Sequence, residues 1–138
     1  IGGPGMSYST DGRLCLHFAQ PLPNVWDAQV SQGVLALQPG RRYRLRATLW
    51  SEQNATIKLI AGENQPPWTN YWNQFVDLPA GQTQNFSAEF RMAAANHLDT
   101  GLFFHVGGHA SPQICLDDVA LTPANQRVWL PLLLHHRP

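Results

Sequence analysis

A strictly alternating segment between residues 42 and 50 is the feature that most constrains the fold of this chain. Tyr43, Leu45, Ala47 and Leu49 are apolar and alternate with side chains of a different kind. This period of two predicts a strand with one face in a core and the other face exposed. The exposed face carries Arg44, Arg46, Thr48 and Trp50. Two arginines and a tryptophan in one row indicate a ligand-binding surface.

Further short segments that are predicted to be strands follow one another along the chain. The complete set of predicted strands is 13–18, 25–30, 34–37, 42–51, 55–61, 71–78, 84–92, 101–106 and 113–121. Turn-forming pairs such as Asp11-Gly12 and Pro39-Gly40 separate them. Many short strands at close spacing predict an all-β sandwich or barrel.

The composition suits one domain with a neutral surface. The chain has 138 residues, a formal net charge of zero and only 13% charged residues, which excludes capture of nucleic acid or of an anionic membrane by charge. No apolar run is long enough to span a bilayer. We expect residues 1–9 to be an N-terminal extension or foreign residues, 10–122 the sandwich, and 123–138 a C-terminal extension or linker. The start at Ile1 suggests a processed or excised domain.

Two cysteines, Cys15 and Cys115, fall in predicted strands near the two ends of the domain. We expect them to form a disulfide that stabilises the fold by roughly 4–5 kcal/mol, because it closes a loop of about 100 residues. Two buried free thiols are the alternative.

Aromatic side chains outside the core are the candidate ligand contacts. The segment 66–72 (PPWTNYW) displays Trp68, Tyr71 and Trp72, although Trp72 shares its parity with core positions. Phe103 and His105 lie on the outward parity of their strand. We assign Trp26 to the core, which leaves Gln29 facing outward. Flat rings beside amide and arginine groups suit the apolar faces and hydroxyl edges of a neutral sugar.

Catalytic and metal-binding patterns are weak. Asp117 and Asp118 are adjacent, so on a strand they point to opposite faces and cannot act as a pair on one substrate. His105 and His109 lack an evident third zinc ligand. Asp117 lies on a core-facing parity, so its carboxylate needs backbone N–H groups, an arginine or a metal ion as a partner.

An ordered set of motifs resembles the carbohydrate-binding modules of the family 4/9 and 22 group. The set is WDAQV, VLALQPGRRYRLRATLW, TNYWNQFVDLPAG, NFSAEFRM, GLFFHVGG and ICLDDVAL, and it covers about residues 10–122. The resemblance implies a jelly-roll β-sandwich of two antiparallel sheets. It also implies binding of β-glucan or xylan chains in a groove on the concave sheet, and attachment to a secreted glycoside hydrolase.

The resemblance also suggests roles for single residues. Gln29 matches the glutamine of a Trp-x-x-Gln strand, Trp50 an aromatic of the groove, and Tyr71 or Trp68 the groove-edge aromatics. Asp117 matches an aspartate that can bind a structural Ca²⁺. The family's usual first strand, which supplies other calcium ligands, is not recognisable before Asp11.

The sequence therefore predicts a secreted, monomeric, non-catalytic carbohydrate-binding module that requires no cofactor and is linked to a catalytic domain. The alternatives are a structural or protein-interaction sandwich and, more remotely, a small hydrolase. The predicted carbohydrate contacts are Gln29, Arg44, Arg46, Trp50, Trp68, Tyr71, Trp72, Phe103 and His105.

Overall fold

A computed structural model describes residues 1–92 and 99–124 in full and residues 132–134 by their backbone. Its elements are β1 (Met6–Ser9), β2 (Leu14–Phe18), η1 (Val25–Asp27), β3 (Gln29–Leu35), β4 (Arg42–Ser51), β5 (Ala55–Glu63), β6 (Asn70–Leu78), β7 (Gln84–Arg91), β8 (Thr100–His105), β9 (Gln113–Pro123) and β10 (Leu132–Leu134).

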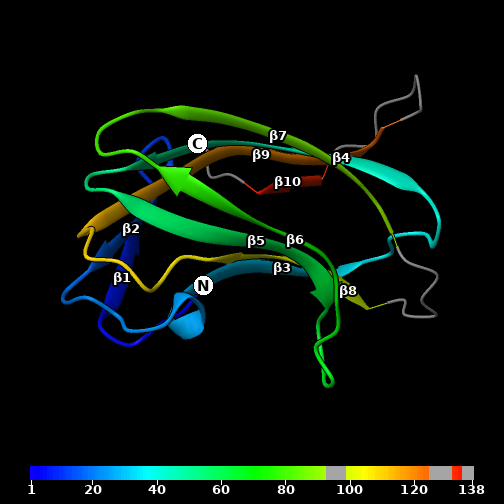
Figure 1. The fold of residues 1–138 in the computed structure, drawn as a ribbon, viewed down its shortest axis with the longest axis horizontal. Coiled ribbons are helices and arrows are strands. Elements are labelled where there is room, and N and C mark those ends of the chain that lie inside the picture. The colour runs from blue at the N-terminus through cyan, green and yellow to red at the C-terminus, as the bar shows by residue number, and fades with distance from the viewer. Residues whose placement is uncertain (93–98, 125–131, 135–138) are drawn as a thin grey trace.

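The strands form two antiparallel sheets packed face to face (Figure 1). A six-stranded sheet has the order β1-β2-β9-β4-β7, and β10 pairs with β9 beside this path. A four-stranded sheet has the order β3-β8-β5-β6. The predicted all-β sandwich is confirmed.

The core lies between the two sheets and follows the alternation of the sequence. Leu45 and Leu49 of β4 are fully buried, as are Leu59 of β5 and Phe104 of β8. Each buried aliphatic or aromatic side chain of this kind contributes about 1.5–3 kcal/mol to folding. Because neighbours in a strand point to opposite faces, burial of these positions turns the intervening residues outward.

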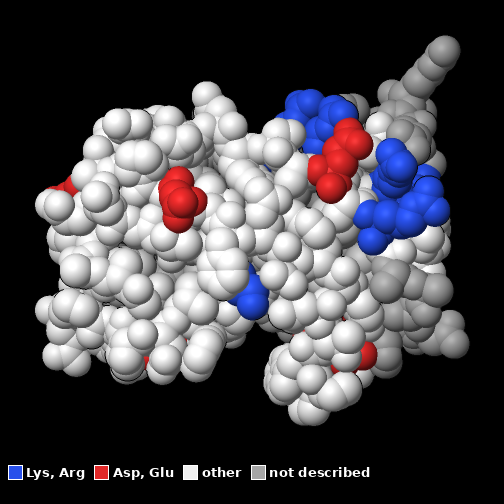
Figure 2. Space-filling model, in the orientation of Figure 1, with Lys and Arg blue, Asp and Glu red and all other residues white. Residues whose placement is uncertain are grey.

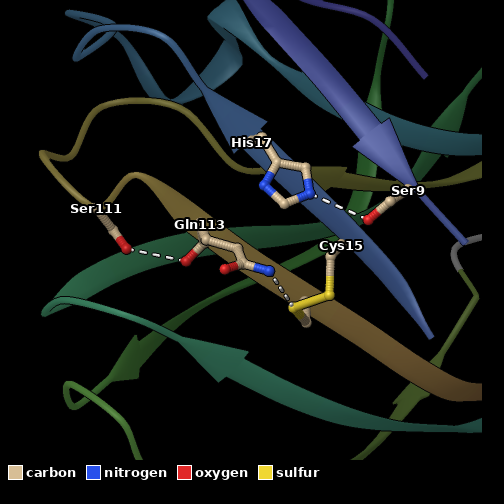
Figure 3. The surroundings of a disulfide bond; sticks show 6 residues. Ser9, Cys15, His17, Ser111 and Gln113 are labelled. Atoms are coloured by element: carbon tan, nitrogen blue, oxygen red, sulfur yellow. Dashed lines mark hydrogen bonds between the residues drawn. A yellow bond between two sulfur atoms is a disulfide. The ribbon is translucent and has the colours of Figure 1, made fainter. Parts of the chain in front are cut away.

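The predicted disulfide joins Cys15 of β2 to Cys115 of β9, which are directly opposite each other in the sheet. Figure 3 shows its surroundings: the amide nitrogen of Gln113 lies 3.6 Å from Cys115 Sγ, and Ser9 bonds to His17 one strand away. The bond ties the early part of the chain to the late part within one sheet.

The sandwich includes residues beyond the boundaries expected from the sequence. Met6–Ser9 form β1 and pair with β2, although the sequence places residues 1–9 outside the sandwich. In the C-terminal segment, Leu132–Leu134 form β10 on β9. Within the described residues, the structure has no helix with the length and apolar character needed to cross a membrane.

Two local irregularities correct the predicted parities. The predicted strand 25–30 begins with the single turn η1, so Trp26 is not part of the alternation that starts at Gln29. In β9 an extra residue opposite β4, next to Asp118 at φ 47°, forms a bulge. Leu116 and Val119 therefore both enter the core cluster, and Asp117 does not belong to the core-facing series.

Candidate functional site

The outer face of the four-stranded sheet carries two rows of side chains that cross the strands. In the first row Gln29, His105, Lys58 and Phe75 are register partners from β3 to β6. In the second row the partners are Ser31, Phe103, Ile60 and Asn73. Directly opposed residues share one face of a sheet, so both rows lie on the side that faces away from the core.

Part of this face is hollowed. The hollow has a volume of about 400 Å³, and we call it the tryptophan hollow. Its lining residues are Trp26, Gln29, Ile60, Glu63, Trp68, Asn70, Phe103 and His105. Figure 2 shows the lower rim of the molecule notched between the part that carries η1 and the part formed by the β5–β6 turn. The same view shows charged side chains gathered near the ends of β4 and β7, while most of the visible face is uncharged.

Two exposed tryptophans come from opposite sides of the hollow. Trp26 of η1 is 64% exposed, and Trp68 of the β5–β6 turn is 58% exposed. The turn η1 is closed by Asp27, whose carboxylate accepts a hydrogen bond of 2.9 Å from the backbone N–H of Asn24. Exposure of a large aromatic ring to water is unfavourable in free energy. Two such rings beside one hollow therefore indicate a binding surface. The exposure of Trp26 shows that the sequence prediction, which placed this residue in the core, is wrong.

A buried carboxylate fixes the turn that carries Trp68. Glu63, 4% exposed, accepts hydrogen bonds from the Tyr71 hydroxyl at 3.1 Å and from the Thr69 N–H at 3.3 Å. The pKa of Tyr71 is raised by burial, by this hydrogen bond and by the charge of Glu63, which keeps the phenol protonated as a donor. Trp68 itself has a left-handed backbone with φ of 59°. Side chains with a Cβ adopt this conformation at a cost of about 1–2 kcal/mol, and such strain is typical of functional sites.

Phe103 and Ile60 form the floor of the hollow. They are only 7% and 4% exposed, so their edges close the bottom rather than project from it. The Phe103 ring lies over the backbone of Gly101, where a β-carbon would come within 2.8 Å of the ring. A bare glycine at this point therefore allows the ring to lie low on the sheet.

His105 and Gln29 are adjacent polar groups of the hollow. Burial lowers the pKa of His105, and the nearby charge of Lys58 lowers it further. The imidazole is therefore neutral at pH 7 and offers one hydrogen-bond donor and one acceptor. Gln29 is exposed and offers an amide with both capacities. This chemistry matches sugar hydroxyl groups, which also donate and accept.

The hollow is not equipped for glycoside hydrolysis. Glu63 is the one carboxylate among its lining residues in the described part of the chain. It is held by Tyr71 and Thr69, whereas hydrolysis of a glycosidic bond generally uses two carboxyl groups on either side of the scissile bond.

Four of the predicted contact residues meet in the hollow, namely Gln29, Trp68, Phe103 and His105. Two others, Tyr71 and Trp72, do not line it. Trp72 is partly buried against the core and stacks on Phe90, with ring centres 4.8 Å apart, so the alternative of a packing role is the one the structure favours. Tyr71 also packs against the core, and its hydroxyl donates a hydrogen bond to Glu63, which lines the hollow.

The remaining three predicted contacts lie on the other sheet, so the expectation of a common surface with Gln29 is wrong. Arg44 pairs with Glu89 of β7. Arg46 borders a shallow depression on the six-stranded sheet. Trp50 is half-buried, with the Arg13 guanidinium 5.1 Å from its ring centre. The cause is strand order: β4 lies between β9 and β7 and has no neighbour in the four-stranded sheet.

The resemblance implies a Ca²⁺ site at Asp117, at the bulge of β9. Asp117 accepts a hydrogen bond of 2.9 Å from the Asp118 N–H, and it is paired with Thr48 across the sheet. No group of three or more acidic, histidine or cysteine side chains gathers anywhere in the described part of the chain. Calcium binding remains a prediction from the resemblance.

Sequence reasoning missed several members of the site. The sequence prediction places Trp26 in the core and does not include Glu63, Ile60 or Asn70. Ile60 could have been found, because Thr56, Lys58 and Ile60 alternate with the core positions of β5. Glu63 gave no such signal, since its burial depends on the turn that folds over it.

The fold and the hollow define a class: β-sandwich modules with an open, aromatic-lined hollow on the outer face of one sheet. A family model described as a carbohydrate binding domain, CBM_4_9, matches residues 7–113, and the chain belongs to this family. It is thus a non-catalytic carbohydrate-binding module with an all-β jelly-roll fold.

Individual relatives agree with this assignment. The chain is 29% identical over 105 residues to a cellulose 1,4-beta-cellobiosidase of Acetivibrio thermocellus, covering 71% of this chain but only 12% of that enzyme. A solved structure titled "CBM4 structure and function" has a TM-score of 0.77 and 26% identity, over 89% of this chain and 81% of that one. The N-terminal cellulose-binding domain of Cellulomonas fimi beta-1,4-glucanase C has a TM-score of 0.68 and 24% identity, over 90% and 92%, and supports the fold alone.

Proposed function

We propose that the tryptophan hollow binds a single β-linked glycan chain, of the β-glucan or xylan type, across the outer face of the four-stranded sheet. The observation that carries the proposal is the pair of exposed rings, Trp26 and Trp68, beside one hollow. Two rings beside a hollow with an apolar floor can contact the apolar faces of successive sugar units. Gln29, His105 and Asn70 supply amide and imidazole groups for the hydroxyls.

The neutral character of this surface favours an uncharged backbone. Binding then depends on ring contact and hydrogen bonds, and each buried aromatic contact contributes about 0.5–1.5 kcal/mol beyond its buried area. The open shape of the hollow suits a soluble or amorphous chain, which can lie in it, rather than a flat crystalline surface.

The disulfide supports a secreted protein, because such bonds persist in oxidising compartments. The match to a small part of a cellobiosidase supports linkage to a glycoside hydrolase in the complete protein. A module of this kind acts by holding the attached enzyme at its polymer, which raises the local substrate concentration.

Affinity electrophoresis through gels that contain hydroxyethylcellulose, barley β-glucan, xylan or laminarin tests the proposal. We expect retardation in at least one gel and its loss in the double variant Trp26→Ala/Trp68→Ala. Both residues are exposed, so this variant should fold. Equal mobility of the wild-type protein in all gels and in a gel without polymer would refute the proposal and favour a structural or protein-interaction role.

A further inference from the structure

Lys58, the one lysine of the chain, lies in the middle of the proposed binding face. It belongs to the first row, between His105 of β8 and Phe75 of β6. Two residues further along β5, on the same face, is Ile60, which is part of the floor of the tryptophan hollow. A chain bound in the hollow would therefore pass within reach of the lysine side chain or end beside it.

The ammonium group of Lys58 has no carboxylate partner among the described residues. Among the described residues, an ion pair joins Arg44 to Glu89, but it lies on the other sheet. Two carboxylates occur on β5 and β6, and both are engaged elsewhere. Asp77 accepts a hydrogen bond of 2.7 Å from Thr56, and Glu63 is tied to Tyr71.

Lys58 is instead held against an aromatic ring. Its ammonium nitrogen lies 5.3 Å from the centre of the Phe75 ring, which is 58% exposed. A cation over a ring face is stabilised without neutralising its charge. This contact directs the amine while leaving its positive charge available to a ligand.

The immediate surroundings make Lys58 the dominant charge of the row. His105, its neighbour on β8, is neutral at pH 7 because burial and the lysine charge lower its pKa. Gln29 and Phe75 carry no charge. A half-buried cation in a neutral surface attracts an anion more strongly than one exposed to bulk water, since screening is weaker there.

We propose that the preferred ligand is a glycan with acidic substituents, whose carboxylate binds Lys58 while the backbone occupies the tryptophan hollow. Uronic acid side groups on a xylan are ligands of this chemistry. The inference rests on the proposed function and adds the substrate class: a neutral backbone recognised by aromatic rings, and an anionic side group recognised by one lysine.

Matched pairs of polymers separate the charge from the backbone. Dissociation constants are measured for glucuronoxylan and for the same polymer after reduction of its carboxyl groups to alcohols, and for carboxymethylcellulose and hydroxyethylcellulose. The wild-type protein should bind the acidic member of the pair with its preferred backbone about fivefold more tightly at low salt, the upper range for a partly exposed ion pair. The preference should fall below about twofold in 0.5 M NaCl, where charges are screened within a few ångströms.

Three variants identify the group responsible. Lys58→Gln should remove the preference and leave the affinity for the reduced or neutral polymer within about twofold. Lys58→Arg should retain the preference. Arg46→Gln removes one positive charge from the other sheet, and this control variant should also retain the preference for the acidic polymer.

The outcomes separate this inference from the proposed function. Equal affinity for acidic and neutral polymers in the wild-type protein, or a preference that survives in Lys58→Gln, overturns the role of Lys58 and leaves the proposed function standing. Failure to bind any of the polymers overturns both.

Discussion

The ring of Phe103 lies directly over Gly101 on the outer face of β8. A β-carbon at residue 101 would lie 2.8 Å from Phe103 Cζ and 2.9 Å from Cε2, which is closer than carbon atoms approach without displacement. A single hydrogen at Gly101 therefore sets the height of the floor of the tryptophan hollow. The shape of a proposed glycan site depends on a residue that offers the ligand no side chain.

Gly101→Ala should raise the Phe103 ring into the hollow. We expect a loss of stability of about 1–3 kcal/mol, the usual cost of overpacking, and about tenfold weaker glycan binding. Isothermal titration calorimetry and urea unfolding measure the two effects. In a Phe103→Ala background the substitution should add little further loss of binding, because its effect acts through the ring. Additive losses in the double variant would show that Gly101 acts by another route.

Trp68→Asn should separate binding from stability. Asparagine tolerates the left-handed backbone that Trp68 adopts with φ of 59°, so relief of strain offsets the lost ring contacts. We expect the free energy of unfolding to stay within about 1 kcal/mol of the wild type and glycan affinity to fall about tenfold or more. A strong drop in melting temperature with retained binding would mean that the ring serves the fold.

Removal of the disulfide should weaken the fold but not the site. The Cys15→Ala/Cys115→Ala variant should lose about 4–5 kcal/mol, since the bond spans 100 residues of chain. The bond lies in the six-stranded sheet, away from the hollow, so the folded fraction should bind glycan with unchanged affinity. Unfolding curves with and without a reducing agent give the first quantity, and titration below the unfolding transition gives the second. A large change in affinity at full folding would contradict this separation.

Stability should fall as the pH drops below about 6.5. Burial lowers the pKa of His105 and of His109 in the folded protein. As the pH falls, the unfolded chain therefore takes up protons before the folded protein does, and this uptake stabilises the unfolded state relative to the folded one. The stability contributed by the neutral histidines is fully present above the unfolded pKa of about 6.5 and is lost as the pH falls through the folded values. His105→Gln should flatten the decline of unfolding free energy between about pH 6.5 and 5. An unchanged slope in that variant would exclude His105 as a source.

The alternation of apolar residues predicted most of the fold. Residues 42–51 form β4 as predicted, and Tyr43, Leu45 and Leu49 are buried. The alternation predicted the wrong face for residues where the chain departs from a regular strand. Trp26 lies in the single turn η1, and the bulge at Asp118 moves Asp117 off the core-facing series.

Only part of the site was predicted from the sequence. The outward parity of a residue does not reveal which sheet its strand joins. Trp50 and Phe103 both face away from the core, yet they lie on different sheets. Strand order depends on long-range pairing, which no local pattern encodes. Similarly, Glu63 enters the site only because the following turn folds back and covers it.

The central claim is that glycan binds on the four-stranded sheet and not on the six-stranded one. Isothermal titration of Trp26→Ala and Trp50→Ala with the polymer that retards the wild-type protein tests it most directly. The account predicts that Trp26→Ala loses at least about tenfold in affinity, the loss expected for one sugar-stacking ring. It predicts that Trp50→Ala, once shown to be folded, binds as the wild type does. Wild-type affinity in Trp26→Ala together with lost affinity in a folded Trp50→Ala would contradict it.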